Sequence, residues 1–116
     1  MRIVDQVAKQ RILKALADPE EVSILMCMKA TSKTAQSIAK ETGIPLSTVY
    51  RKLEELKAAG LTMTQHFTFS AGRKVDFMTT TFVVMRIKLE KNEVEIEVVP
   101  SNEIVARSLS SNPSSE

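Results

Sequence analysis

Apolar residues recur at helical spacing in the first part of the chain. From residue 3 to residue 17 they return every three or four positions, which predicts a helix with one apolar stripe and a basic outer face. A second helix is predicted over residues 19–29, because Asp18 and Pro19 form a typical helix start. Its residues are apolar on nearly all sides, so we expect it to be central and largely buried, with Cys27 in the core.

Two further helical patterns follow, joined by a very short connection. The first is predicted to begin after Thr34, a good N-cap residue, and to end at Gly43, which can take the left-handed conformation that closes a helix. The second spans about residues 46–59. Since only Ile44 and Pro45 separate the two, they must cross steeply, as in a helix-turn-helix. The apolar residues that the spacing of the second helix turns inward are Leu46, Val49, Leu53 and Leu56.

After residue 60 the pattern changes from a helical period to alternation, which is typical of strands. Residues 61–69 and 75–81 are predicted to pair as a hairpin, and the turn between them carries Arg73 and Lys74. A hairpin that directly follows the second helix of a helix-turn-helix is the wing of a winged helix. The sequence therefore predicts a winged helix-turn-helix with a basic wing tip.

A second hairpin is predicted over residues 82–99, and charge fixes its register. With Lys91 and Asn92 as a two-residue turn, opposite charges meet on one face and apolar residues meet on the other. A shift by one residue would place charges on the apolar face. We expect that apolar face to be covered. The cross-strand partners in this register are Glu90 with Glu93, Lys88 with Glu95, Arg86 with Glu97, Leu89 with Val94, Ile87 with Ile96 and Met85 with Val98.

Length and composition are those of one globular domain. The chain has 116 residues, 43% of them hydrophobic, and a net charge of only +2, so its composition alone does not indicate a polyanion ligand. We predict an α+β fold in which residues 1–99 form the winged helix with its extra C-terminal β-hairpin. Residues 100–116, rich in serine and asparagine, are expected to form a flexible tail. The single cysteine and the lack of a long apolar run favour a cytoplasmic protein without membrane contact.

Residues 34–61, TAQSIAKETGIPLSTVYRKLEELKAAGL, closely resemble the helix-turn-helix core of the ArsR-like winged-helix regulators, particularly the archaeal ones. With the preceding helices and the wing, the resemblance covers about residues 5–81. It implies a homodimer that places helix 46–59 of each subunit in successive major grooves, with the wings on flanking backbone or minor groove. The resemblance rests on Ile38-Ala39 before Gly43, the Ile44-Pro45 turn, Ser47-Thr48-Val49-Tyr50, Leu53, Leu56 and Ala59-Gly60-Leu61.

The chain departs from that family in two respects. The metal-sensing members carry paired cysteines or clusters of histidine and acidic residues, whereas this chain has only Cys27 and His66, so metal sensing is not supported. The family often ends in a long dimerisation helix, whereas here the 82–99 hairpin occupies that place. Dimer contacts could therefore come from the first helix, from the hairpin or from both.

Candidate DNA-contacting residues are hydroxyl and cationic side chains around helix 46–59 and at the wing tip. Hydroxyls bond phosphates or bases, arginine can contact guanine through two hydrogen bonds, and lysine neutralises phosphates. Tyr50 could instead pack its ring beside Leu46. The predicted set is Thr34, Ser47, Thr48, Tyr50, Arg51, Lys52, Lys57, Arg73 and Lys74.

The sequence thus predicts a transcriptional regulator that binds double-stranded DNA with sequence specificity and acts as a dimeric repressor. Two alternatives stay open: a winged-helix adaptor for other proteins, and a sensor in which an unidentified small-molecule effector binds the β-rich half. Adaptors tend to carry acidic or apolar residues on the recognition face, where this chain has hydroxyls and cations. With no glycine-rich phosphate loop and no histidine-rich metal spacing, neither enzymatic activity nor a cofactor or metal is predicted.

Overall fold

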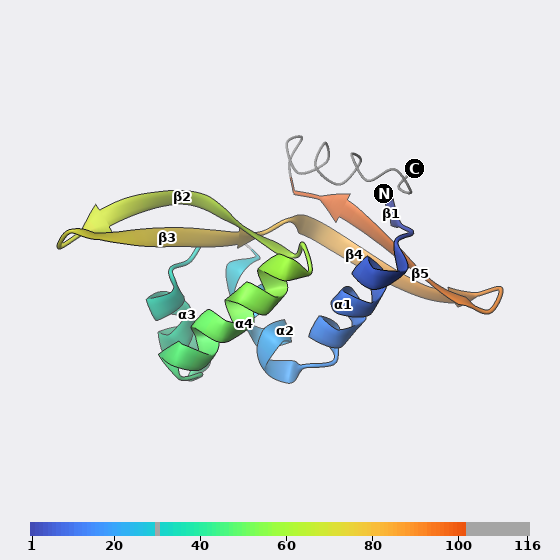
Figure 1. The fold of residues 1–116 in the computed structure, drawn as a ribbon, viewed down its shortest axis with the longest axis horizontal. Coiled ribbons are helices and arrows are strands. Elements are labelled where there is room, and N and C mark those ends of the chain that lie inside the picture. The colour runs from blue at the N-terminus through green and yellow to red at the C-terminus, as the bar shows by residue number, and fades with distance from the viewer. Residues whose placement is uncertain (30, 102–116) are drawn as a thin grey trace.

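The computed structural model describes residues 1–29 and 31–101, which form an α+β winged helix with an additional hairpin (Figure 1). This confirms the predicted fold class. In the described residues no helix is long and apolar enough to cross a membrane. The elements in chain order are β1 (Arg2–Ile3), α1 (Gln6–Leu16), α2 (Pro19–Met28), α3 (Ala35–Thr42), α4 (Leu46–Ala58), β2 (Thr62–Ser70), β3 (Arg73–Thr80), β4 (Phe82–Glu90) and β5 (Glu93–Pro100).

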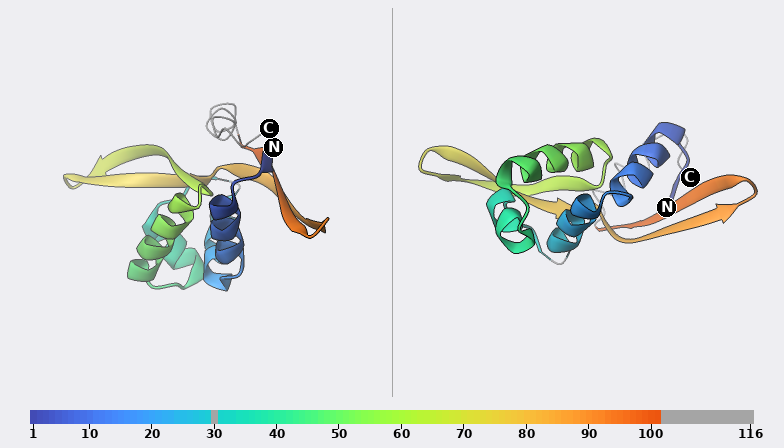
Figure 2. Two further views of the ribbon diagram at one scale, coloured as in Figure 1. Left: turned by 45° about the vertical axis from the view of Figure 1, so that its right-hand side comes forward. Right: turned by 90° about the horizontal axis from the view of Figure 1, so that it is seen from below.

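Strands β1 to β5 of the described residues form two separate antiparallel sheets, which extend to opposite sides of the helices (Figures 1 and 2). Strands β2 and β3 make the wing. Strands β4 and β5 make the second hairpin, and the short β1 pairs with β5 to give a sheet of order β1-β5-β4. The helices therefore lie between a wing on one side and a second hairpin on the other.

Local capping accounts for the tight helix-turn-helix. The Thr34 hydroxyl accepts a hydrogen bond from the backbone N–H of Ser37 at 3.1 Å and so begins α3, as predicted. Gly43 ends α3 in the left-handed conformation, with φ of 77°. Only Ile44 and Pro45 then precede α4, as the sequence predicts.

The core lies where α2, α3 and α4 meet the base of the wing. Helix α2 is central, and its neighbours contribute side chains with no exposed surface. The backbone of Lys33 pairs with that of Met78 through two hydrogen bonds of 2.9 and 2.7 Å, which ties the start of the helix-turn-helix to β3. The side chains with no exposed surface at the centre are Ile24, Met28, Ile38, Val49 and Leu56.

Several residues predicted to lie buried in the helices are placed differently in the structure. Ile3 lies in β1 opposite Ile96 rather than in the first helix, because the Asp5 side chain caps α1 only at Gln6. Met26 is exposed although α2 is otherwise central, since no element of the described part of the chain covers that side. Leu46, predicted to face inward, is partly exposed because it begins α4 and lines a surface groove. Cys27 is only partly buried, with its thiol 3.6 Å from a Glu41 carboxylate oxygen.

The second hairpin has the predicted register throughout its outer half. Lys91 and Asn92 form its two-residue turn, both with positive φ, and every pair from Glu90–Glu93 to Met85–Val98 is present. The closest ion pair across the strands is diagonal, between Lys88 and Glu97 at 3.7 Å. Strand β5 continues through Pro100, one residue beyond the predicted boundary, and residues 102–116 of the predicted tail lie outside the described residues.

Candidate nucleic-acid interface

A surface groove of about 560 Å³ separates the outer side of α4 from the wing. The start of α3 forms one end of the groove, and the wing tip forms the other. Glu54 adds a carboxylate to the lining, and Gln36 contributes an amide that the sequence prediction missed, although its place in the first turn of α3 puts it beside Thr34. The predicted DNA-contacting residues that line the groove are Thr34, Tyr50, Lys57, Arg73 and Lys74.

The first two turns of α4 present three further predicted contacts, Ser47, Thr48 and Arg51, at the surface. Ser47 is exposed and Thr48 is half-buried, while Arg51 is exposed and bonds the Glu55 carboxylate one turn away at 3.3 Å. Tyr50 is exposed along the groove rather than covered. An ion pair at such an exposed i,i+4 position contributes little to stability, so the Arg51 guanidinium can exchange that partner for another acceptor.

The Thr34 hydroxyl already serves the fold. It accepts from the Ser37 N–H at 3.1 Å and lies 3.2 Å from the Ser37 hydroxyl. Because the N-cap bond stabilises α3, the hydroxyl is held at the groove edge in a fixed orientation.

Lys52, predicted to face outward and to bind phosphate, is placed inward instead. Its side chain is 8% exposed, and its ammonium pairs with Asp18 and lies 3.6 Å from a Glu20 carboxylate oxygen. The hydrogen bond to Lys52 lowers the pKa of Asp18, and the same bond raises the pKa of Lys52. Lys52 thus joins α4 to the start of α2, and it is removed from the set of DNA contacts.

A pair of carboxyl groups lies beside this ion pair. Burial, together with the hydrogen bond to Glu55 and its negative charge, raises the pKa of Glu21 to about 7. The same hydrogen bond lowers the pKa of Glu55. Glu21 is 4% exposed, and in its protonated form it donates to the Glu55 carboxylate, which links α2 to α4. Burial of a second negative charge here would be costly.

We expect the Glu21→Gln variant to be more stable than the parent at pH 8 and similar to it at pH 5. The folded-state pKa of Glu21 is raised from 4.5 to about 7, so its contribution is complete below 4.5 and is lost as the pH rises through 7. The difference should reach about 1–3 kcal/mol, because one pKa unit corresponds to about 1.4 kcal/mol and Glu55 shifts oppositely. Urea unfolding between pH 5 and pH 8 measures it. The exposed Glu54→Gln variant is the control, and a pH profile of Glu21→Gln parallel to the parent's would contradict the assignment.

At the wing tip, a tight turn projects cations away from the helices. Ala71 and Gly72 form a two-residue turn, both with positive φ, and Arg73 and Lys74 follow at once on β3. Lys74 lies 3.6 Å from an Asp76 carboxylate oxygen. Both cations are exposed, as the sequence predicts.

Two phenylalanines of β2 are a feature that the sequence prediction did not single out. Phe67 is 53% exposed and Phe69 is 69% exposed. Their alternation with threonine was visible in the sequence, and it correctly puts them on one face of the strand. The outer part of β2 extends beyond α3 and α4 (Figure 1), and among the described residues nothing covers the two rings there.

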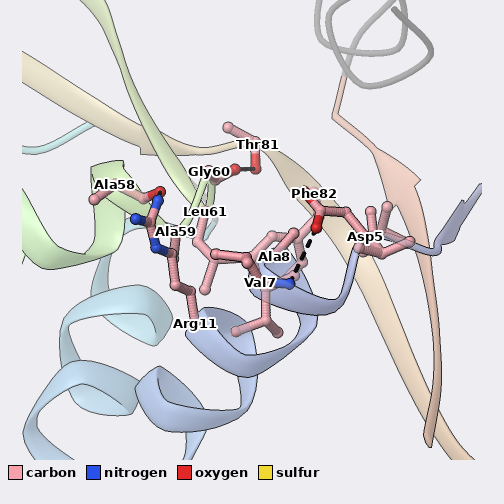
Figure 3. Close-up of a pocket in the computed structure, with 13 residues that line it drawn as sticks. Asp5, Val7, Ala8, Arg11, Ala58, Ala59, Gly60, Leu61, Thr81 and Phe82 are labelled. Atoms are coloured by element: carbon pink, nitrogen blue, oxygen red, sulfur yellow. Dashed lines mark hydrogen bonds between the residues drawn. The ribbon is translucent and has the colours of Figure 1, made fainter. Parts of the chain in front are cut away.

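A second, smaller cavity of about 260 Å³ lies on the other side of α4 (Figure 3). It is enclosed by the first half of α1, the end of α4 and the start of β4, and most of its lining is apolar. Arg11 at its edge donates to the carbonyl of Ala58 at 3.3 Å, which joins α1 to the end of the recognition helix. Thr81 donates to the carbonyl of Gly60 at 2.8 Å on the same side.

The remaining candidates for special chemistry have ordinary partners. The His66 ring stacks on Phe77, with centroids 4.4 Å apart, on the wing. Burial, followed by the charge and hydrogen bond of Glu41, raises the pKa of the Cys27 thiol, which makes it less reactive. Among residues 1–29 and 31–101, no group of three or more His, Cys, Asp or Glu side chains could hold a metal ion.

Comparison with known proteins places the helix-turn-helix and the wing in a known family. The family model described as "Sugar-specific transcriptional regulator TrmB" matches residues 21–87. No curated protein sequence gives a match.

Solved structures share the fold at low sequence identity. HlyU from Vibrio cholerae N16961 has a TM-score of 0.52 and 19% identity over 64% of this chain and 75% of its own. An ArsR family transcriptional regulator, RHA00566, has a TM-score of 0.53 and 18% identity over 66% of this chain and 74% of its own. NolR from Sinorhizobium fredii has a TM-score of 0.51 and 15% identity over 96% of this chain and 92% of its own. The predicted ArsR-like resemblance is confirmed for the fold, and its archaeal type stays a prediction.

Proposed function

The chain belongs to the TrmB family and is a DNA-binding transcriptional regulator, and from this we propose that it reads a specific duplex sequence with α4 in the major groove. The observation that carries the proposal is the groove between α4 and the wing. The Thr34 hydroxyl at the start of α3, with the Tyr50 phenol and the Lys57 ammonium of α4, faces Arg73 and Lys74 across it. The charged side chains of the lining are three cations, Lys57, Arg73 and Lys74, and two acids, Glu54 and Asp76, and the wing-tip cations are exposed, so the groove favours a polyanion such as DNA.

We assign different roles to the first two turns of α4, to the groove and to the wing tip. The start of a recognition helix carries the side chains that reach base edges, which assigns base reading to Ser47, Thr48 and Arg51. Tyr50 and Lys57 lie further along the groove wall, where sugar and phosphate groups would pass. Arg73 and Lys74 contact the backbone or the minor groove beside it, and each phosphate contact adds to the salt dependence of binding.

Fluorescence polarisation against a duplex that the protein selects from a random pool tests this proposal. Arg51→Ala is expected to weaken binding to the selected duplex by about 5- to 150-fold and to weaken binding to unrelated duplex much less, because a lost base contact costs about 1–3 kcal/mol. Equal losses on both duplexes would rule out base reading by Arg51. Lys14→Ala on α1 is the matched control, since it removes an exposed charge outside the groove.

The wing cations should behave differently. Arg73→Ala is expected to weaken binding to all duplexes by a similar factor and to reduce the slope of log affinity against log salt by about one. A salt series of the same polarisation measurement gives the slope. An unchanged slope would place Arg73 off the phosphates.

We further propose that the protein acts as a homodimer and represses by occupying its site, in the cytoplasm where its DNA lies. Two recognition helices can then occupy successive major grooves. The support on this chain is the outer end of the second hairpin. Strand β5 packs one face of this hairpin against the core through Ile96 and Val98, whereas Ile87 and Leu89 on the same face of β4 are exposed. A second copy of the chain would bury that face.

An effector is the second candidate role, and the cavity beside α1 favours it. A small molecule there would contact both the end of α4 and the start of β4, and so would link the recognition helix to the second hairpin. The family description names sugars, so sugars and apolar metabolites are the ligands to test. A rise in melting temperature that the cavity-filling variant Ala8→Leu abolishes would support this role, and no rise with any compound would remove it.

A further inference from the structure

The outer wing carries an apolar patch made of Phe67 and Phe69. The two rings pack edge to face, with centroids 5.9 Å apart and planes at 89°, yet each residue is more than half exposed. Exposed apolar patches of this kind mark contact surfaces more often than single exposed residues do. A strand that needed only to extend the wing could carry threonine here, as it does at Thr68.

Strand register shows which way the patch faces. Phe67 lies opposite Asp76, and Phe69 lies opposite Lys74. Both partners lie an even number of residues from Met78, so all these side chains share one face of the hairpin. Met78 is buried against the helices, and the same face continues outward as part of the groove lining. The rings therefore lie on the side of the wing that a duplex bound along α4 would meet.

Charge around the rings identifies the kind of partner. The Lys74 ammonium lies 4.8 Å from the centre of the Phe67 ring, and Arg73 is exposed beside it. A purely apolar protein partner would have to bury these cations. A DNA minor groove instead offers phosphates along both edges and, where a base step opens, the apolar stacking faces of the base pairs, which matches an aromatic pair flanked by cations.

We propose that Phe67 and Phe69 form a wedge that enters the minor groove next to the site read by α4, opens a base step there and bends the duplex. This inference rests on the proposed DNA-binding function and extends it from phosphate contact to deformation of the DNA. Apolar side chains inserted between base steps unstack them, and the burial of the rings offsets that cost. Lys74 and Arg73 hold the adjacent phosphates. The protein would then prefer sites with a flexible step at this position.

The test uses the full chain and a duplex of about 30 base pairs that the wild-type protein selects from a random pool, long enough for two half-sites. Energy transfer between dyes at the duplex ends reports bending, and 2-aminopurine placed successively along the flanking groove reports unstacking. The Phe67→Thr/Phe69→Thr double variant keeps residues suited to a strand but removes both rings. Phe69→Leu keeps an apolar wedge. His66→Thr is the matched control, because it removes an exposed ring from the opposite face of the same strand.

With wild type, 2-aminopurine fluorescence is expected to rise at one step and the ends to approach each other. The double variant should lose both signals and bind at least about ten-fold more weakly, with an unchanged salt slope because no charge is lost. Phe69→Leu should retain most of the bend, and His66→Thr should retain all of it. Circular dichroism checks that the variants are folded, and the single Phe69→Thr variant replaces the double one if the double variant unfolds.

Some results would overturn the wedge. If the wild type selects a duplex but the double variant bends it equally, the wedge is wrong and the DNA-binding function stands. If the double variant alters only the sedimentation of the free protein, the rings serve protein association instead. If the wild type selects no duplex at all, the proposed function fails and the wedge fails with it.

Discussion

Replacement of Lys52 by alanine is expected to destabilise the fold by about 2–4 kcal/mol, although the residue is a lysine on a helix predicted to bind DNA. Its ammonium is the partner that neutralises Asp18 at the start of α2, and it also lies 3.6 Å from Glu20. Loss of one member of a buried ion pair leaves the other charge without compensation, which commonly costs about 3–5 kcal/mol, and the partial exposure of Asp18 reduces that figure. Urea unfolding measures the difference.

Lys57→Ala is the matched control for this prediction. Lys57 lies on the same helix but is exposed in the groove, so its loss should weaken DNA binding and leave stability nearly unchanged. Below pH 3.8 the cost of Lys52→Ala should shrink. The pKa of Asp18 is lowered from that value, so its contribution is present above 3.8 and is lost as the pH falls through the folded-state pKa. If the stability of Lys52→Ala matched that of Lys57→Ala, the structural role assigned to Lys52 would be wrong.

Features fixed by neighbouring residues were predictable from the sequence. The Thr34 cap, the left-handed Gly43 and the two-residue gap define the helix-turn-helix within residues 34–45, and tertiary contacts only reinforce them. The second hairpin is similar, because alternating charges on one face allow one register and Lys91-Asn92 closes it.

Features set by distant contacts were harder to predict. Lys52 lies three residues after Val49 and four before Leu56, a spacing that fits the inner face of α4, but we predicted this lysine to face outward and bind phosphate. The ion pair with Asp18, which lies 34 residues earlier in the chain, holds the ammonium inward. Ile3 pairs with Ile96 across almost the whole chain, which no local pattern indicates.

The candidate DNA-binding site was likewise predicted only in part. Residue type and position relative to the turn located the wing cations and the start of α4, because short-range geometry decides which side chains project there. The exposure of Phe67 and Phe69 depends instead on where the helices stop covering the wing. Alternation along a strand shows which residues share a face, but it does not show how far along the strand that face is covered.

The largest effect on assembly is expected from Leu89→Lys. Leu89 is 80% exposed at the outer end of the second hairpin, on the face whose inner residues are buried. In a twofold dimer each substitution occurs twice. If burial of one leucine contributes about 1.5–3 kcal/mol, the variant should raise the dimer dissociation constant by at least about 100-fold. Sedimentation equilibrium over a concentration series measures this constant.

Val84→Lys provides the control, because Val84 is also exposed on β4 but on the opposite face, where it pairs with Val99. It adds the same charge to the same strand and should leave the dimer intact. With Leu89→Lys, binding to a duplex with two half-sites should fall to the level of a single half-site, since the second recognition helix is no longer tethered to the first. Dissociation caused by Val84→Lys, with no effect of Leu89→Lys, would place the interface on the charged face instead. A dimer unaffected by either substitution would leave α1 as its interface and would refute the role of the hairpin.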